Sequence, residues 1–268
     1  MEFPKTLIKR NGYIERIKPF MRKNIAKVLT GQRRVGKSFL LYQLMDQLLV
    51  EEPDANIIYI NFEDFAFSHI QTAEDMHAYI MSKFRKEKYN YIFVDEIQEI
   101  VNFERVIRSL LLNENNDIYI TGSNAKMLSG ELATYLSGRY IEFSVYSLSY
   151  LEFLAFHKLE NNNESLYLYS RYGGLPYLIN LPLKDETVNE YLKSVYSTIV
   201  FRDVVSRYNL RNSSFLEKLV QFLSENIGNL FSAKNISDYL KSQHSTISVN
   251  QIQNYTEQCF SYTQGGKV

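Results

Sequence analysis

The sequence is poor in the residues that most often build disulfide frameworks and metal sites. It contains no tryptophan, a single cysteine (Cys259) and four histidines, which are scattered without metal-ligand spacing. One cysteine excludes an intramolecular disulfide, and isolated histidines are far more typical of surface or core positions than of a metal centre. We therefore expect a chain that folds without disulfides, as proteins of a reducing compartment do.

A surplus of one charge and a long hydrophobic run are also missing. The 30 basic and 30 acidic residues cancel, so any contact with nucleic acid or an anionic membrane must be a local patch. No run approaches the roughly 18 to 20 apolar residues of a membrane span. The N-terminus MEFPKTLIKRNGY has no secretion core. These absences predict a cytoplasmic protein without membrane contact.

What the first half does contain is an alternation of short apolar runs with amphipathic segments. The runs typical of buried strands are residues 25–30, 55–62, 89–96, 117–121 and 139–145. The segments with helical spacing between them are 37–50, 73–86 and 101–112. Strands that are apolar on both faces and alternate with helices favour a parallel sheet covered on both sides, an α/β fold.

From about residue 149 the pattern becomes almost entirely helical. The helical stretches are 149–157, 164–172, 186–206, 213–227, 232–241 and 248–258. We expect three parts, namely an α/β domain over 1–148, a helical lid over 149–206 and a C-terminal helical region over 207–268.

The segment GQRRVGKS, residues 31–38, fits the pattern G-x-x-x-x-G-K-[ST] between a predicted strand and a predicted helix. Glycines in such a loop let backbone N–H groups surround a phosphate, and the helix N-terminus adds a favourable dipole. We expect Lys37 to reach the β- and γ-phosphates and Ser38 to bind Mg²⁺. The alternative is a basic turn before a helix. The residues expected at the nucleotide are Gly31, Gln32, Arg33, Arg34, Val35, Gly36, Lys37, Ser38 and Phe39.

The run YIFVDE, residues 91–96, ends in two adjacent carboxylates. Ligands of parallel sheets bind at the carboxyl ends of strands. We therefore expect Asp95 to hold Mg²⁺, mostly through water, and Glu96 to act as the general base on the attacking water. The alternative is a strand that simply runs into solvent.

Two later segments carry weaker signals. In ITGSN, residues 120–124, Asn124 or Ser123 is a candidate to orient the water or to sense the γ-phosphate, although both residues also suit a cap or turn. In LSGRY, residues 136–140, Arg139 is a candidate arginine finger toward a neighbouring subunit. The alternative for Arg139 is an ordinary surface arginine.

Together, GQRRVGKS, FVDE, TGSN and SGR resemble the AAA+ class of P-loop ATPases in kind and in order. The second acid, Glu96, separates the pattern from GTPases and most P-loop kinases. More narrowly, the chain resembles a family of prokaryotic AAA-domain ATP-binding proteins related to the archaeal and signalling (STAND-type) ATPases. The likeness covers roughly residues 10 to 258 and includes VDEIQ (94–98) and GGLP (173–176).

The resemblance implies a sheet in the order 5-1-4-3-2, ATP rather than GTP, and Mg²⁺. It also implies a helical lid whose turn, here Leu175 and Pro176, approaches the adenine. The helices from about 213 to 258 resemble the three-helix part of a winged-helix domain, with 248–258 as the third helix.

Members of this family usually continue past the winged helix into a further C-terminal domain. In this chain CFSYTQGGKV follows the third helix, without an evident two-stranded wing. We therefore expect an incomplete winged-helix region, in a truncated gene product or a natural variant that lacks the last domain.

The leading functional prediction is an ATP-binding protein, an Mg-dependent ATPase that uses nucleotide state to drive conformational change or assembly. Its expected partners are ATP, a second copy of the chain through Arg139, and an unidentified protein client. A milder form is a signalling switch that hydrolyses ATP slowly.

Two other functions compete with it. One is a DNA-binding regulatory or loader module with an ATPase clamp, but no lysine or arginine lies between Ser242 and Gly266, and a helix that faces phosphates normally carries several. The other is a small-molecule kinase, which adjacent Asp95 and Glu96 and the helical C-terminal region disfavour.

Overall fold

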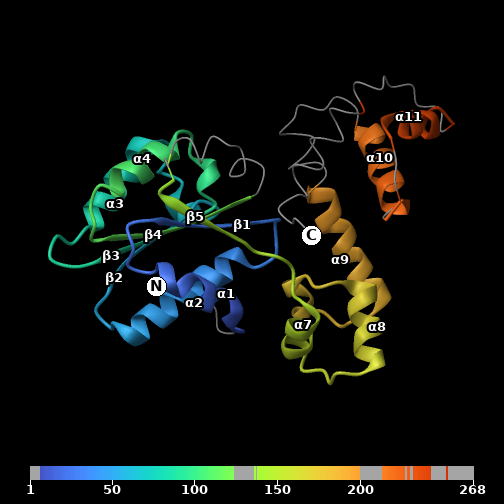
Figure 1. Cartoon of the computed structure of the whole chain (residues 1–268), viewed down its shortest axis with the longest axis horizontal. Helices are drawn as coiled ribbons and strands as arrows, with labels where there is room; N and C mark the ends of the chain where they lie inside the picture. The colour runs from blue at the N-terminus through green and yellow to red at the C-terminus, as the bar shows by residue number, and fades with distance from the viewer. Residues whose placement is uncertain are drawn as a thin grey trace. The chain divides into compact units, whose positions relative to one another are not determined.

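The structure, a computed structural model, describes residues 7–123, 136, 138–199, 213–226, 228–229, 232–242 and 252 of the chain. The chain divides into two compact units, residues 1–180 and 181–268. The first unit contains a sheet with helices on both of its faces, and the second unit is helical (Figure 1). The domain boundaries at 148 and 206 stay predictions.

The first unit is built on a five-stranded sheet in which every neighbouring pair is parallel. The strands are β1 (Ala26–Gly31), β2 (Asn56–Asn61), β3 (Asn90–Asp95), β4 (Asn116–Ser123) and β5 (Tyr140–Ser144). Their order across the sheet is β2-β3-β4-β1-β5. This order confirms the α/β fold class and the predicted arrangement 5-1-4-3-2.

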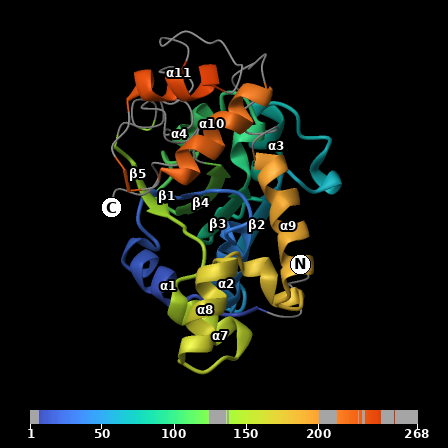
Figure 2. The same ribbon diagram turned by 90° about the vertical axis from the view of Figure 1, so that its right-hand side faces the viewer.

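Helices cover the two faces of this sheet, with α1 and α2 on one side and α3 and α4 on the other (Figure 2). Neighbouring strand residues point to opposite faces, so Tyr91 and Phe93 pack with the first pair of helices and Ile92 and Val94 with the second. All four side chains are fully buried. Burial on both faces explains why the strands read as continuous apolar runs. The helices and 3-10 turns of this part are α1 (Asn11–Ile17), η1 (Lys18–Phe20), α2 (Lys37–Glu51), η2 (Phe65–Phe67), α3 (Ala73–Lys83), η3 (Ile97–Glu99) and α4 (Phe103–Leu110).

Local polar contacts set several helix boundaries. Thr72 caps α3 and forms a reciprocal capping box with Asp75. The helix ends at Lys83, three residues before the predicted end, and the Asn56 amide donates to the Lys83 carbonyl over 3.0 Å. The short helix α1, which contains Gly12, is not predicted by the sequence pattern, since seven residues are too few for a helical period to stand out.

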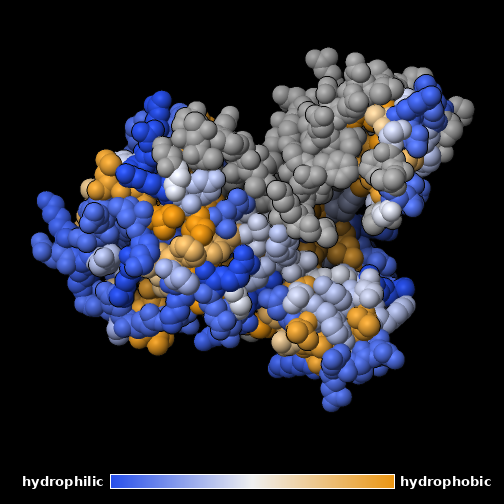
Figure 3. Space-filling view, in the orientation of Figure 1, coloured by the Kyte–Doolittle hydropathy of each residue, from blue (hydrophilic) through white to orange (hydrophobic). Residues whose placement is uncertain are grey.

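The first unit also contains the helices that follow the sheet, namely α7 (Tyr150–His157), α8 (Asn163–Tyr172) and η4 (Pro176–Asn180). Ser149 caps α7 and forms a capping box with Glu152. The segment from Val145 to Ser149, here termed the β5–α7 linker, connects the last strand to α7. Hydrophobic residues come to the surface at the level of the sheet, between the more hydrophilic surfaces of the two helix layers (Figure 3).

The second unit consists of α9 (Asp185–Thr198), α10 (Ser213–Glu225) and α11 (Ala233–Ser242) in its described part. A small core joins α10, α11 and Ile252; its buried residues are Leu219, Phe222, Ile236, Leu240 and Ile252. Of the predicted third helix, 248–258, only Ile252 lies within the described residues, so the winged helix stays a prediction. Among the helices that the structure describes, none is long and apolar enough to cross a membrane.

A charged pair is buried between the two central strands, near their amino ends. Lys27 of β1 forms an ion pair with Asp117 of β4, and both side chains are fully buried. Asp117 also accepts hydrogen bonds from the Tyr119 hydroxyl and the Arg22 N–H, each over 2.8 Å. Burial lowers the pKa of Lys27, and the charge of Asp117 partly opposes that shift. The pair is thus tolerated only because each member supplies the other's counter-charge.

We expect Lys27→Met to lower the free energy of unfolding by about 3 to 5 kcal/mol, because it leaves the Asp117 carboxylate buried without its cation. The double variant Lys27→Met/Asp117→Asn should lose clearly less. Urea unfolding followed by circular dichroism measures both.

The matched control is Lys88→Met, which breaks an ion pair with Asp54 at the surface. Water and salt screen that pair, so the unfolding midpoint should change little. Equal losses for the two lysine variants would contradict the account given for Lys27.

The turn between α8 and η4 is packed backbone to backbone against the β5–α7 linker. The Leu148 N–H donates to the Gly174 carbonyl over 2.7 Å, and the Tyr169 hydroxyl donates to the Leu148 carbonyl over 2.9 Å. A Cβ atom at Gly174 would lie 2.2 Å from the Leu148 carbonyl oxygen. Residue 174 must therefore be a glycine, because its backbone lies too close to that of Leu148 for a side chain to fit. This contact packs the end of α8 against the linker that leads into α7.

Gly174→Ala should reduce the free energy of unfolding by about 2 to 3 kcal/mol, because the linker must move to admit a methyl group. Gly12→Ala in α1 is the control: its Cβ would have no atom within 4 Å, and alanine favours a helix by about 1 kcal/mol. Thermal unfolding should therefore show effects of opposite sign, and effects of the same sign would contradict the packing argument.

Candidate functional site

The parallel strands bring the carboxyl ends of β1, β3 and β4 to one edge of the sheet. β1 ends at Gly31, β3 at Asp95 and β4 at Ser123, and Gly31 pairs with Ser123. The loop after β1 leads into α2, which begins at Lys37. The segments GQRRVGKS, VDE and TGS therefore lie together at the carboxyl edge, where sheets of this type bind ligands.

Gly31 turns the chain out of β1 where there is no room for a side chain. Its φ is 152°, and a Cβ atom would lie 2.2 Å from the Val145 carbonyl oxygen. The Val145 N–H donates to the Thr30 carbonyl over 2.7 Å. The start of the loop is thus packed against the backbone of the β5–α7 linker.

Lys37 is buried inside its own loop. Its ammonium group donates to the carbonyl oxygens of Gly31 and Gln32 over 3.0 and 3.1 Å, and it lies 3.8 Å from a carboxylate oxygen of Glu96. Burial lowers the pKa of Lys37, while the carboxylates of Glu96 and Asp95 oppose that shift. This lysine therefore lies between the loop carbonyls and the carboxylates of the carboxyl edge.

Asp95 lies at the end of β3 with its carboxylate directed at the loop. It accepts hydrogen bonds from the hydroxyls of Ser38 and Thr121, and the Tyr59 hydroxyl lies 3.5 Å away. Burial raises the pKa of Asp95, and the bonds from Ser38 and Thr121 oppose that shift. A hydroxyl and a carboxylate side by side are oxygen ligands of the kind that Mg²⁺ prefers, so the residues present fit that ion.

Glu96 adopts a left-handed backbone conformation, with φ of 53° and ψ of 47°. For a residue with a side chain this costs about 1 to 2 kcal/mol. Its N–H donates to the Thr121 hydroxyl over 3.0 Å, and its carboxylate accepts a hydrogen bond from the buried Gln98 amide. Surrounding contacts thus hold the Glu96 carboxylate beside Lys37.

Three further residues contact the site, although they are not among those predicted from the sequence. Thr121 bridges the carboxylate of Asp95 and the N–H of Glu96, Gln98 holds Glu96, and Tyr59 lies against Asp95. A signal did exist for Thr121, because a hydroxyl inside an otherwise apolar strand requires a partner. No comparable signal marks Tyr59, since tyrosines are common in the strands of this chain.

The remaining loop residues differ in exposure. Gln32 and Arg34 are exposed, whereas Val35 is buried. Arg33 forms an ion pair with Glu63 over 3.2 Å. Outside the loop, Phe39 is 50% exposed and contacts the ring of Tyr42 edge-on. The expected contact of Phe39 with nucleotide stays a prediction.

Pro176 lies next to the phosphate loop. A Cβ atom built on Gly36 would be 3.8 Å from the Pro176 side chain. The turn that contains Leu175 and Pro176 is thus adjacent to the residue that begins α2. This placement agrees with a role for the turn at the nucleotide, which remains a prediction.

Of the last two predicted site residues, one is not described by the structure and the other lies away from the site. Asn124 lies outside the described residues, one position after the end of β4. Arg139 is exposed, and its carbonyl accepts from the Ala26 N–H at the amino end of β1. Gly31 is five residues further along that strand, roughly 17 Å away at 3.3 Å per residue. An arginine side chain does not span that distance, so Arg139 cannot reach the loop of its own chain.

Comparisons with known proteins agree with this geometry. Residues 23–154 match the family model of an AAA domain, and residues 163–258 match that of a domain of unknown function, DUF8612. In fold, the chain resembles the Hsp104–ADP complex of Saccharomyces cerevisiae, with a TM-score of 0.50 and 12% identity over 97% of this chain and 39% of that one.

Two relatives match over most of this chain. An uncharacterized protein of Haemophilus influenzae is 35% identical over 94% of the chain, and one of Methanocaldococcus jannaschii is 31% identical over 87%. The chain spans only 64% and 54% of the lengths of these two relatives. Strand order, loop geometry and the match over residues 23–154 lead to one conclusion: this part of the chain is an AAA domain with the fold of P-loop proteins.

Proposed function

We propose that this protein binds ATP with Mg²⁺, hydrolyses it, and uses the change in nucleotide state to drive a change in its own conformation or assembly. The observation that carries the proposal is the arrangement of four side chains at the carboxyl edge. Lys37, Ser38, Asp95 and Glu96 come from two segments almost sixty residues apart, and they contact one another directly.

The phosphate loop supplies the binding part of this proposal. Its backbone N–H groups and the N-terminus of α2 would attract the phosphates. The Lys37 ammonium now bonds to the carbonyls of Gly31 and Gln32. A phosphate group would compete for the Lys37 ammonium, because the attraction between two opposite charges adds to the hydrogen bond and a neutral carbonyl offers no such charge.

Ser38 and Asp95 would hold the metal ion. They provide one hydroxyl and one carboxylate that already share a hydrogen bond, and Mg²⁺ typically completes its octahedron with phosphate oxygens and water. When bound, the ion would neutralise charge that develops on the phosphate oxygens. Thr121 keeps Asp95 in position from the adjacent strand.

Glu96 would take the proton of the attacking water. A general base must lie within hydrogen-bond reach of that water, and Glu96 is directed toward the loop by its left-handed backbone and by Gln98. Residues that are held in sparsely populated conformations cluster at active sites, which supports this assignment. The neighbouring turn with Leu175 and Pro176 would contact the base of the nucleotide.

Glu96→Gln should bind Mg-ATP about as well as the parent protein but hydrolyse it roughly 100- to 10,000-fold more slowly, the usual share of a general base. Lys37→Ala should lose most of the binding. Titration with a fluorescent ATP analogue and a phosphate-release assay measure the two properties separately.

Glu99→Gln is the matched control, because Glu99 is exposed in the same 3-10 turn. It should leave both binding and turnover unchanged. Failure of the parent protein to bind Mg-ATP would refute the proposed function, whereas binding with normal turnover in Glu96→Gln would refute only the role of Glu96.

Arg139 would act on the nucleotide of a neighbouring copy of the chain. It is exposed and too distant from its own loop, and a guanidinium supplied in trans stabilises the charge of phosphoryl transfer in related P-loop sites. Asn124, the residue after Ser123 in the sequence, stays the candidate for orienting the water. The assignment of Arg139 assumes a homo-oligomer.

Mixing two inactive variants tests this arrangement. Glu96→Gln lacks the base but keeps Arg139, and Arg139→Ala lacks the arginine but keeps the base. If Arg139 acts in trans, the mixture should hydrolyse ATP faster than the sum of the separate proteins. Arg108→Ala, which alters another exposed arginine, should remain active alone. A mixture no faster than the sum would contradict action in trans.

A further inference from the structure

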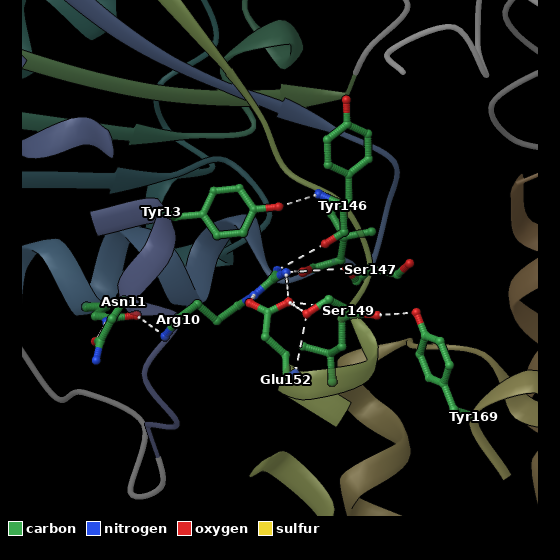
Figure 4. Close-up of polar contacts among 11 residues, drawn as sticks. Arg10, Asn11, Tyr13, Tyr146, Ser147, Ser149, Glu152 and Tyr169 are labelled. Atoms are coloured by element: carbon green, nitrogen blue, oxygen red, sulfur yellow. Dashed lines mark hydrogen bonds and ion pairs between the residues drawn. The ribbon is translucent and has the colours of Figure 1, made fainter. Parts of the chain in front are cut away.

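Arg10 is a buried arginine that connects parts of the first unit far apart in the sequence. Only 5% of the residue is exposed. Its guanidinium donates to the Val35 carbonyl over 3.1 Å, to the carbonyls of Tyr146 and Ser147 over 3.0 and 3.4 Å, and to both carboxylate oxygens of Glu152 over 2.8 and 3.0 Å. Figure 4 shows the guanidinium group pointing at the linker and at Glu152. One side chain thus touches the phosphate loop, the β5–α7 linker and α7.

The bond to Val35 acts on the phosphate loop through a peptide plane. The Val35 carbonyl and the Gly36 N–H belong to one planar peptide unit, and in a trans unit these two groups point in opposite directions. None of the described residues has a cis peptide bond. By fixing the carbonyl, Arg10 therefore also fixes the direction of the Gly36 N–H, which points away from Arg10.

That N–H is one of the loop donors placed just before α2. Gly36 is the residue that precedes the first turn of α2 and has a left-handed φ of 95°. A charged donor on the carbonyl also polarises the peptide unit and makes its N–H a stronger donor, as in chains of hydrogen bonds. Arg10 thus both aims and strengthens a phosphate-binding group without touching the ligand.

The other side of the guanidinium is attached to α7. Glu152 occupies the first turn of that helix and also accepts from the Ser149 N–H over 2.9 Å. Burial opposes ionisation of Glu152, but the bonds from Arg10 and Ser149 outweigh it and hold the pKa of Glu152 below its usual value. The carboxylate is therefore charged at neutral pH, and its contact with Arg10 is bidentate, a geometry with strong directional preference.

We infer that Arg10 is a positioning residue which couples the phosphate loop to helix α7. Because one rigid, planar group bonds to both, a rotation of the Val35–Gly36 peptide on phosphate binding must shift the guanidinium and with it Glu152. The coupling is reciprocal, so the position of α7 also sets the affinity of the loop for phosphate. This inference rests on the proposed binding of ATP.

A purely structural anchor would have the same contacts, so the test needs readouts that an anchor would not change. Two are suitable: the affinity for Mg²⁺ with a non-hydrolysable ATP analogue, and the amide hydrogen exchange of residues 146–157 with and without that analogue. In the parent protein, the analogue should slow exchange both in the loop, 31–38, and in 146–157.

In Arg10→Gln the analogue should bind about tenfold more weakly, the effect of losing one charged hydrogen bond. At saturating analogue, exchange should still slow in 31–38 but no longer in 146–157. In Glu152→Gln, which keeps Arg10 on the loop, affinity should fall less, and the response of 146–157 should again be lost.

Arg16→Gln is the matched control, since Arg16 is exposed on α1 and its guanidinium lies over the ring of Tyr13, 6.0 Å from the ring centre. It should behave as the parent protein in both readouts. Circular dichroism establishes which variants are folded, and Glu152→Gln alone decides the question if Arg10→Gln does not fold.

The outcomes separate the two proposals. A folded Arg10→Gln that binds the analogue within twofold of the parent, or a Glu152→Gln in which 146–157 responds normally, would overturn the coupling while the proposed function stands. No binding by the parent protein would overturn the proposed function and the coupling with it.

Discussion

Every contact at the candidate site depends on the five strands of the sheet running in the same direction. Parallel pairing places the ends of β1, β3 and β4 at one edge. Gly31, Asp95 and Ser123 therefore lie at the same edge although they are far apart in the sequence. The opposite edge receives the amino ends, where Arg139 lies. The direction of the strands therefore decides which charged residues lie beside the phosphate loop of their own chain and which lie far from it.

Within that edge, fixed polar contacts hold residues in conformations that are unfavourable by themselves. Thr121 bonds to the carboxylate of Asp95 and to the N–H of Glu96, and Gln98 bonds to the carboxylate of Glu96. These bonds offset the cost of burying two acids and of the left-handed backbone at Glu96. A preorganised site of this kind requires little rearrangement when charge develops on a bound phosphate.

The sequence predicted the α/β fold and the loop because both leave local signatures, whereas the sheet order was implied by the resemblance to AAA+ ATPases. Strands buried on both faces give continuous apolar runs, and a phosphate loop needs glycines, a lysine and a hydroxyl at fixed spacing. Arg10 leaves no such signature, since its partner Glu152 lies 142 residues away. Gln98 belongs to the motif VDEIQ, but its bond to Glu96 leaves no signature, because Glu96 adopts a backbone conformation that no propensity favours. Contacts of this type become visible only when the chain is folded.

The buried Lys27–Asp117 pair has a consequence for the alignment of the sheet. If β1 slipped by two residues along β4, each side chain would stay on its own face, so the apolar pattern alone would not oppose the shift. The slip would, however, move Lys27 and Asp117 about 6.6 Å relative to each other. Both charges would then be buried without a partner of opposite charge. Gly31 would lose its place beside Ser123 at the same time. The ion pair near one edge thus fixes the alignment of the strands at the opposite, carboxyl edge, where the candidate site lies.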